Sequence, residues 1–381
     1  MKYSMKNGTA TVKVVCAVLF LVFTFCFLCC YQGDMLTVLQ HVLSEGKTRY
    51  NVWIGGILFT LFFYVLQLLV YWLTKLSGAW HALTYFPSVL LLTILTDAQC
   101  HSGKLTLDPW WWLTPLLLII YIGGVWVARA YEQIPPLRKH VGVRLDLLWQ
   151  NLLVMFCLFF FAGGMSNGND VYHYRVHAEA CILRHDYQAA LKVGKKSLAT
   201  DSSLTMIRAY ALAKEGLLGE CLFEYPVVGG SQVLLPNQQS VKWMMVDAGT
   251  TYRDMGLVLL QPLSPLCYLS FVVRHHYATP MAKDYLLMGY LLDKRLDDFA
   301  KWVGKFYALN DTLPQHYREA LVLYSHLRSQ PVVDYHHAVT EADFADYQQL
   351  ERSEPNNKVL RQNLLRDTYG NTYWYYYEYG L

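Results

Sequence analysis

Charged residues are scarce in this 381-residue chain. Asp, Glu, Lys and Arg make up 16% of it and hydrophobic residues 54%, whereas soluble domains carry about 25% charged residues. The shortage is concentrated before Gly164, and the remainder reads as a water-soluble, mostly helical domain. The composition therefore predicts two parts, one in lipid and one in water.

Basic clusters are missing as well. The formal net charge is only +3, and no block of Lys and Arg of the kind that neutralises phosphates is present. This excludes a nucleic-acid-binding protein and leaves membrane lipid as the first expected partner.

Catalytic motifs are also absent. The chain has no HExxH, no GxSxG, no P-loop and no GxGxxG between a strand and a helix. Such patterns place zinc ligands, a nucleophile, or a loop that binds phosphates. We therefore predict no catalytic residue, no cofactor and no metal site.

Long apolar runs, by contrast, are abundant before Gly164. A bilayer is crossed by about 20 apolar residues in a helix. Trp110, Trp111 and Trp112 resemble an interfacial aromatic belt. The predicted spans of a membrane domain over residues 1–164 are 14–30, 52–73, 81–96, 110–128 and 147–164.

No ionisable residue lies near the middle of any of these spans, which argues against a coupled transporter. The Gly123–Gly124 pair in the fourth span is expected to permit close helix packing. An alternative interpretation of the first span is a cleaved signal, because it has a basic start and an apolar core. In that case FLCC, ending at Cys30, resembles a lipoprotein cleavage site.

Positive charge predicts the orientation, because cytoplasmic loops of membrane proteins are enriched in Lys and Arg. Five spans place the two ends on opposite sides of the membrane. With the N-terminus in the cytoplasm, the part after Gly164 lies outside. The inside segments then hold Lys2, Lys6, Lys13, Lys75, Arg129, Arg138, Lys139 and Arg144, and the outside loops hold only Lys47, Arg49 and Lys104.

A linker over 165–170 precedes a predicted helical repeat domain over 171–381. Its first unit, HAEACILRHDYQAALKVGKKSLATDSS, has a helix–turn–helix pattern, and RAYALAKEGLLGECLFEYP repeats it 31 residues later, from Tyr187 to Leu218. The second helix of the first unit is expected to include Val193 and Leu198. The predicted repeat positions are Ala178, Cys181, Tyr187 and Ala190, then Ala209, Leu212, Gly216, Leu218 and Cys221.

This recurrence resembles the tetratricopeptide repeat, whose period is about 34 residues. A third unit is expected at DYLLMGYLLDKRLDDFAKWVGKFYALND, and LPQHYREALVLYSHL is expected to open another helix at Pro314, whereas 227–280 is irregular. Such units stack into an α-solenoid, and its concave groove usually holds a peptide or a partner protein. The predicted fold class is therefore all-α, with about five transmembrane helices followed by a tetratricopeptide-like domain.

Three phrases resemble a known family. ALAKEGLLGECLFEYP, LPQHYREALVLY and YGNTYWYYYEYG are similar to segments of uncharacterised multi-pass membrane proteins of Bacteroidota, which join a membrane region to a C-terminal tetratricopeptide-like domain. The resemblance covers most of the chain after Gly164. It implies a bacterial inner-membrane protein with a periplasmic domain, and it implies no reaction.

Cysteine and histidine offer weaker alternatives. Cys181 and Cys221 occupy core positions of adjacent repeats and are expected to be free thiols, with a bridge between them left open. His173 and His177 are four apart on a helix, but zinc needs three or four converging ligands. Asp97, with Cys100 and His101, is expected to be a polar boundary of the third span rather than a small site.

The chain ends in an aromatic run, YGNTYWYYYEYGL. An end repeat exposes an apolar face, so we expect Tyr373, Trp374, Tyr376 and Tyr377 to cap the helical stack. The preceding helix is expected to start near Pro355 and end at Gly370. Its predicted apolar stripe is Val359, Leu360 and Leu364.

These features favour a membrane-anchored scaffold or adaptor whose outer domain binds a protein or peptide. The alternative is a multi-pass membrane enzyme of the glycosyltransferase type with accessory helical repeats. Such enzymes place paired acidic residues in the first outer loop, whereas Asp34 and Glu45 are not adjacent here.

Overall fold

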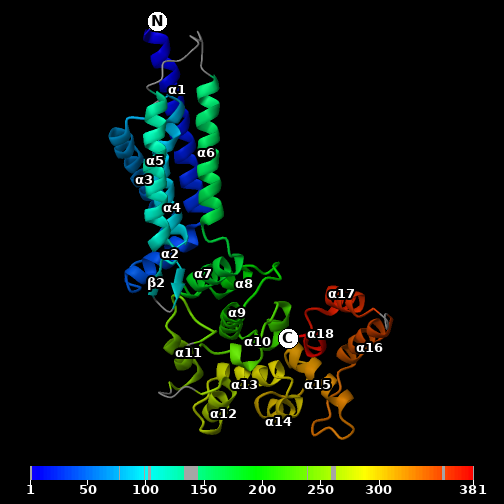
Figure 1. Ribbon diagram of the computed structural model, residues 1–381. Helices are drawn as coiled ribbons and strands as arrows, with labels where there is room; N and C mark the ends of the chain where they lie inside the picture. The colour runs from blue at the N-terminus through cyan, green and yellow to red at the C-terminus, as the bar shows by residue number, and fades with distance from the viewer. Residues whose placement is uncertain are drawn as a thin grey trace. The chain divides into compact units, whose positions relative to one another are not determined.

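The computed structural model describes residues 2–76, 78–97, 99–101, 104–132, 145–237, 239–258, 263–353 and 357–380. The chain divides into two compact units, Met1–Asn169 and Asp170–Leu381 (Figure 1). Both are built from helices, and the first adds a short antiparallel hairpin of β1 (Gln99–His101) and β2 (Lys104–Thr106). The predicted all-α class is confirmed.

The first unit contains the five predicted apolar helices. Its helices are α1 (Lys2–Cys26) with a π-helical end (Phe27–Tyr31), α2 (Gly33–Leu43), α3 (Val52–Thr74), α4 (Phe86–Asp97), α5 (Trp110–Glu132) and α6 (Leu145–Met165). A 3₁₀ segment, Gly78–Tyr85, runs directly into α4. The segments long and apolar enough to cross a membrane are Ala10–Tyr31, Val52–Thr74, Gly78–Asp97, Trp110–Tyr131 and Leu145–Met165.

The 3₁₀ start of the third span is held by a buried asparagine of α6. The Asn151 side chain accepts a hydrogen bond from the Ala82 N–H at 2.8 Å and donates one to the Gly78 carbonyl at 2.9 Å. Lipid offers no partner to an unpaired peptide group, so each such group must be satisfied within the protein. Asn151 therefore lets this span begin without regular α-helical hydrogen bonds.

We expect Asn151→Leu to lower the apparent melting temperature of the purified chain in detergent. The substitution leaves the buried Ala82 N–H without an acceptor, which costs about 1–3 kcal/mol. Gln150→Leu is the matched control, because the neighbouring Gln150 is exposed. Equal melting temperatures for the two variants would contradict the role given to Asn151.

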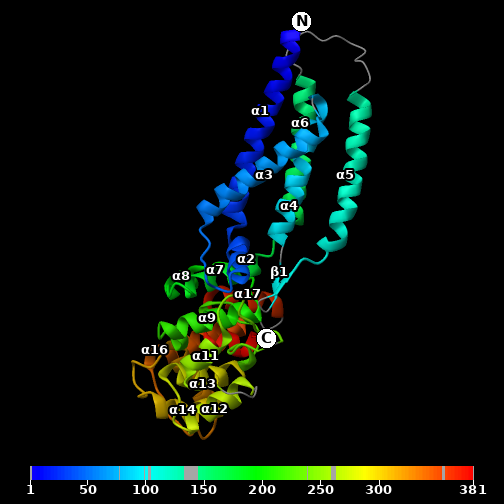
Figure 2. The ribbon, with the colours of Figure 1, turned by 90° about the vertical axis from the view of Figure 1, so that its left-hand side faces the viewer.

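At one end of this unit, basic side chains donate hydrogen bonds to neighbouring helices. Lys13 donates to the Tyr71 hydroxyl at 2.5 Å, and Arg129 donates to the carbonyls of Leu73 and Thr74 at 2.5–3.1 Å. The start of α1 and the ends of α3 and α5 consequently lie at the same end of the unit (Figure 2). Lys13, Lys75 and Arg129 of the predicted inside segments lie at this end.

Close helix packing involves different glycines from those expected. A Cβ on Gly56 would lie 2.3 Å from the Cys29 sulfur, so α3 meets the π-helical end of the first span there. The expectation for Gly123 and Gly124 is wrong, because a Cβ on either would meet no atom of the described residues within 4 Å. The reason is that α5 stands at the edge of the unit (Figure 2), and both glycines are exposed on it.

The second unit consists of short helices joined by tight turns. Its longer helices are α7 (Asp170–Ile182), α9 (Ser202–Lys214), α12 (Pro265–Arg274), α13 (Pro280–Leu292), α14 (Leu296–Phe306), α15 (Gln315–Leu327), α16 (Ala338–Ser353) and α17 (Lys358–Tyr369). The shorter ones are α8 (Tyr187–Lys192), α10 (Leu218–Cys221), α11 (Ala248–Met255) and α18 (Tyr373–Tyr379), with 3₁₀ turns at Leu222–Glu224 and Ser231–Val233.

Three helix pairs are joined by the same type of turn. His185, Gly216 and Lys294 have φ of 59°, 72° and 57°, and each lies two residues before the second helix of its pair. In all three turns the next N–H bonds to the carbonyl five residues back, as in a Schellman motif. The 31-residue spacing of the first two turns therefore matches the sequence recurrence.

A single core joins these pairs. Helix α13 is buried along most of its length and packs between α12 and α14, while α10 packs against both α13 and α15. Gly219 permits the crossing of α10 and α15, because a Cβ there would lie 2.7 Å from the Tyr317 ring. Helices α13 and α15 thus pack against α10, which comes earlier in the chain.

Candidate functional site

The predicted repeat residues lie at the helix crossings and turns of the second unit. Tyr187 and Cys221 are half-buried, and Gly216 is exposed in its turn. The remaining positions, Ala178, Cys181, Ala190, Ala209, Leu212 and Leu218, are all buried.

The predicted second helix of the first repeat is too long. Helix α8 ends at Lys192, and Leu198 is 71% exposed beyond it. The reason is Gly194, which has φ of 60° and lies so close to Tyr174 that a Cβ would be 2.8 Å from its ring. The chain therefore leaves the helix at this point.

The aromatic tail forms helix α18. The Thr372 side chain caps it by accepting a hydrogen bond from the Tyr375 N–H at 3.3 Å. Tyr373, Trp374 and Tyr376 are 0%, 3% and 6% exposed, and Tyr377 is half-buried. The rings thus pack into the core of the second unit.

The predicted apolar stripe of the preceding helix is wrong. Val359, Leu360 and Leu364 are exposed, and α17 buries Leu365 instead. The stripe was chosen from three residues that share one face, but the core side is set by where α17 meets α16 and α18. The predicted start at Pro355 lies outside the described residues, and Gly370 follows the last residue of α17.

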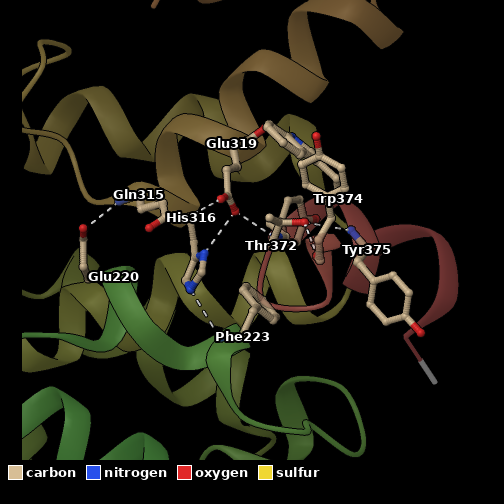
Figure 3. Close-up of polar contacts among 10 residues, drawn as sticks. Glu220, Phe223, Gln315, His316, Glu319, Thr372, Trp374 and Tyr375 are labelled. Atoms are coloured by element: carbon tan, nitrogen blue, oxygen red, sulfur yellow. Dashed lines mark hydrogen bonds and ion pairs between the residues drawn. The ribbon is translucent and has the colours of Figure 1, made fainter. Parts of the chain in front are cut away.

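A buried carboxylate anchors the tail (Figure 3). Glu319 of α15 accepts the Tyr373 N–H at 2.7 Å, the Gln315 amide at 2.8 Å and His316 Nδ1 at 3.0 Å. The Trp374 indole N–H donates to the Glu319 main-chain carbonyl at 2.8 Å. One residue thus binds the tail through both its side chain and its backbone.

The histidine connects this cluster to an earlier part of the chain. The Phe223 N–H donates to His316 Nε2 at 3.3 Å, so the proton of a neutral His316 lies on Nδ1 and faces Glu319. The Gln315 N–H donates to Glu220 at 2.7 Å. The end of α10 and the following turn are therefore bonded to the first turn of α15.

Aromatic hydroxyls complete the attachment. Tyr373 donates to the Leu291 carbonyl at 3.2 Å and Tyr376 to the Leu292 carbonyl at 3.0 Å, both at the end of α13. The Phe223 ring lies 5.5 Å from the Tyr373 ring and 4.8 Å from the Tyr376 ring, between centroids. Helix α18 is thereby bound to α13, α15 and the turn after α10.

We call the buried hydrogen-bonded group of Gln315, His316, Glu319 and Tyr373 the clamp, because it holds α18 against α15. The His316 and Glu319 side chains are 1% and 4% exposed. Within the part of the chain that the structure describes, the donors to the Glu319 carboxylate all belong to the second unit itself. A general acid or base must reach a substrate proton, whereas these groups face each other. The cluster is suited to hold helices together.

The fully buried Glu179 and the half-buried Asp284 also bond to other parts of the second unit. Glu179 is fully buried and accepts the N–H groups of Met244, Met245 and Val246 at 2.8–3.4 Å. Burial raises the pKa of Glu179 to about 7, and the backbone donors oppose that rise. Burial also raises the pKa of Asp284, which accepts the Tyr307 hydroxyl.

The other residues that the sequence offered as candidate catalytic or metal-binding residues lie on different elements. Asp34 is in the first turn of α2, Glu45 pairs with Lys47 at 3.0 Å, and Asp97 accepts the Trp110 indole N–H at 2.8 Å. Cys100 and His101 lie on β1. His173 and His177 lie on α7. Within the described ranges no group of three or more His, Cys, Asp or Glu side chains converges as metal ligands.

Cys181 and Cys221 are free thiols. Burial favours a higher pKa for Cys181, but hydrogen bonds from His177 and Arg184 outweigh it and lower the pKa below its ordinary value. Burial and the nearby Glu224 carboxylate raise the pKa of Cys221 to about 11. The bridge left open by the sequence is not formed.

Comparison with known protein families matches part of the chain. The sequence model of a family of unknown function (DUF6057) matches residues 263–380, a region that contains α12 to α18 and the Glu319 cluster. No curated protein matches the chain, and no solved structure does. The match and the five apolar helices agree with the predicted membrane protein.

Proposed function

We propose that this protein is a scaffold of the bacterial inner membrane whose tetratricopeptide-like unit binds a protein or peptide on the periplasmic side. The basic end formed by Lys13, Lys75 and Arg129 supports a cytoplasmic N-terminus. The turn shared by three helix pairs supports the repeat reading. The buried clamp supports a rigid binding surface rather than a reaction centre.

The observation that carries this proposal is the outer face of α17. Val359, Leu360 and Leu364 are 69%, 41% and 37% exposed. Leu360 and Leu364 are four residues apart and share one side of the helix, away from the buried Leu365. Surface helices normally turn such residues inward, so an outward apolar stripe marks an interaction site. The apolar side of an amphipathic helix of a partner suits these exposed apolar side chains.

We expect the double substitution Leu360→Asp and Leu364→Asp to abolish capture of the partner protein. The experiment crosslinks the full chain in native membranes through a photoreactive residue at Val359 and identifies the crosslinked protein. The matched control, Asn363→Asp with Thr368→Asp, adds the same charge to exposed positions of the same helix. Both variants should retain the fold, because all four side chains are exposed.

Persistent crosslinking to the same protein in the Leu360→Asp, Leu364→Asp chain would exclude α17 as the binding surface. The enzyme alternative makes a different prediction. If Asp34→Asn, Glu45→Gln or Asp97→Asn removes the cellular phenotype while capture survives, a glycosyltransferase-like activity should replace the scaffold.

A further inference from the structure

A groove of about 590 Å³ lies at the beginning of α3, wholly within the first unit. Its floor is one face of that helix, with Ile54, Leu58 and Phe62 spaced four residues apart. These side chains are 59%, 62% and 53% exposed. A helix rises 1.5 Å per residue, so they form an apolar track about 12 Å long running into the span.

Polar groups gather at the outer end of this track. Arg49, Tyr50 and Gln40 line the groove beside the apolar face. Arg49 is three residues before Val52, where the span begins, and the exposed Trp53 occupies the level of an interfacial aromatic belt. The Arg49 guanidinium therefore lies where phospholipid headgroups lie.

Two of these groups have unused hydrogen-bonding capacity. Arg49 is exposed and makes no hydrogen bond or ion pair with any residue that the structure describes, whereas Lys47 of the same loop pairs with Glu45 at 3.0 Å. The buried Tyr50 hydroxyl oxygen likewise has no partner among the described residues. A guanidinium is geometrically suited to bind a phosphate through two parallel N–H donors.

We propose that this groove binds an anionic phospholipid of the surrounding bilayer. The phosphate lies on Arg49, and one acyl chain follows Ile54, Leu58 and Phe62. The occupant is a lipid because the apolar track runs into the predicted span, and it is anionic because Arg49, which lines the groove, pairs with no carboxylate of the described residues. The site is separate from the proposed protein-binding face and does not depend on it.

The test is native mass spectrometry of the full chain released from detergent. The chain is titrated with phosphatidylglycerol or with phosphatidylcholine of the same acyl chains. We expect phosphatidylglycerol to bind up to about fivefold more tightly. Both lipids present an ionised phosphate to Arg49, but the choline ammonium of phosphatidylcholine cancels the net charge, and exposed charge interactions contribute about 0–1 kcal/mol. Arg49→Gln should abolish the preference, and Lys47→Gln, which changes the charge equally, should preserve it.

A second variant tests the apolar track. Leu58→Trp fills the groove at an exposed position, so it should weaken binding of both lipids several-fold. Equal affinity of the natural chain for the two lipids would overturn the proposal. So would equal losses in Arg49→Gln and Lys47→Gln. A polyprenyl phosphate that remains bound in place of phospholipid would also overturn the proposed occupant.

Discussion

A chain that stops after Gly370 is expected to lose most of the stability of its second unit. The deletion removes Tyr373, Trp374 and Tyr376, three rings that are nearly fully buried, and each contributes on the order of 2 kcal/mol. It also uncovers Phe223 and leaves Glu319 without the Tyr373 N–H. Typical domains are stable by only about 5–15 kcal/mol, so this loss is a large fraction of the total.

Hydrogen exchange followed by mass spectrometry measures this loss in the full-length membrane protein. Amides of α13 and α15 should exchange faster by several orders of magnitude in the truncated chain, because about 1.4 kcal/mol corresponds to each factor of ten. Amides of α3 and α6 serve as the internal reference. The variant Tyr375→Ala with Tyr379→Ala removes two rings that are only partly buried, and a smaller effect is expected.

The rival interpretation of the tail is a membrane anchor, since Tyr and Trp are favoured at bilayer surfaces. That interpretation predicts unchanged exchange in α15 and weaker binding of the second unit to lipid vesicles. The burial of Trp374 beside Phe344, with ring centroids 5.0 Å apart, favours the cap.

The sequence was most informative where one physical requirement dominates. About 20 apolar residues in a row have few alternatives to a membrane span, and all five spans were found for that reason. The 3₁₀ start of the third span was not predicted. Its stabilising partner, Asn151, is 69 residues away from Ala82, and no local pattern at residues 78–85 indicates it.

Helix faces on the second unit were less predictable. Apolar spacing placed Val359, Leu360 and Leu364 toward the core, but α17 buries Leu365. Both faces of that helix carry leucine, so periodicity alone does not choose between them. The choice depends on the docking of α16 and α18, which brings together residues distant in the sequence.

The sequence indicates the clamp only weakly. His316 and Glu319 are three apart in LPQHYREALVLY, and residues at that spacing meet on a helix. The sequence gives no sign that this pair is buried, nor that its partners are Phe223 and Tyr373. Those contacts depend on α10 and α18 reaching the same turn of α15, a long-range arrangement.

Glu319→Leu is expected to release the tail even though every ring remains present. The substitution leaves the Tyr373 N–H, His316 Nδ1–H and the Gln315 amide without their acceptor. A buried donor left unpaired costs about 1–3 kcal/mol, so the two buried donors, the Tyr373 N–H and His316 Nδ1–H, together cost about 2–6 kcal/mol, and the half-buried Gln315 amide adds less. Exchange of the amides of residues 372–380 should therefore accelerate strongly.

Two further variants make this result specific to the clamp. Glu319→Gln keeps an acceptor oxygen for the Tyr373 N–H while removing the charge, so its tail should exchange at an intermediate rate. Glu341→Gln breaks an ion pair with His336, a residue whose side chain is 74% exposed, and such surface pairs contribute about 0–1 kcal/mol. If the tail of Glu319→Leu stays as protected as that of Glu341→Gln, the rings alone hold α18 in place and the carboxylate is dispensable.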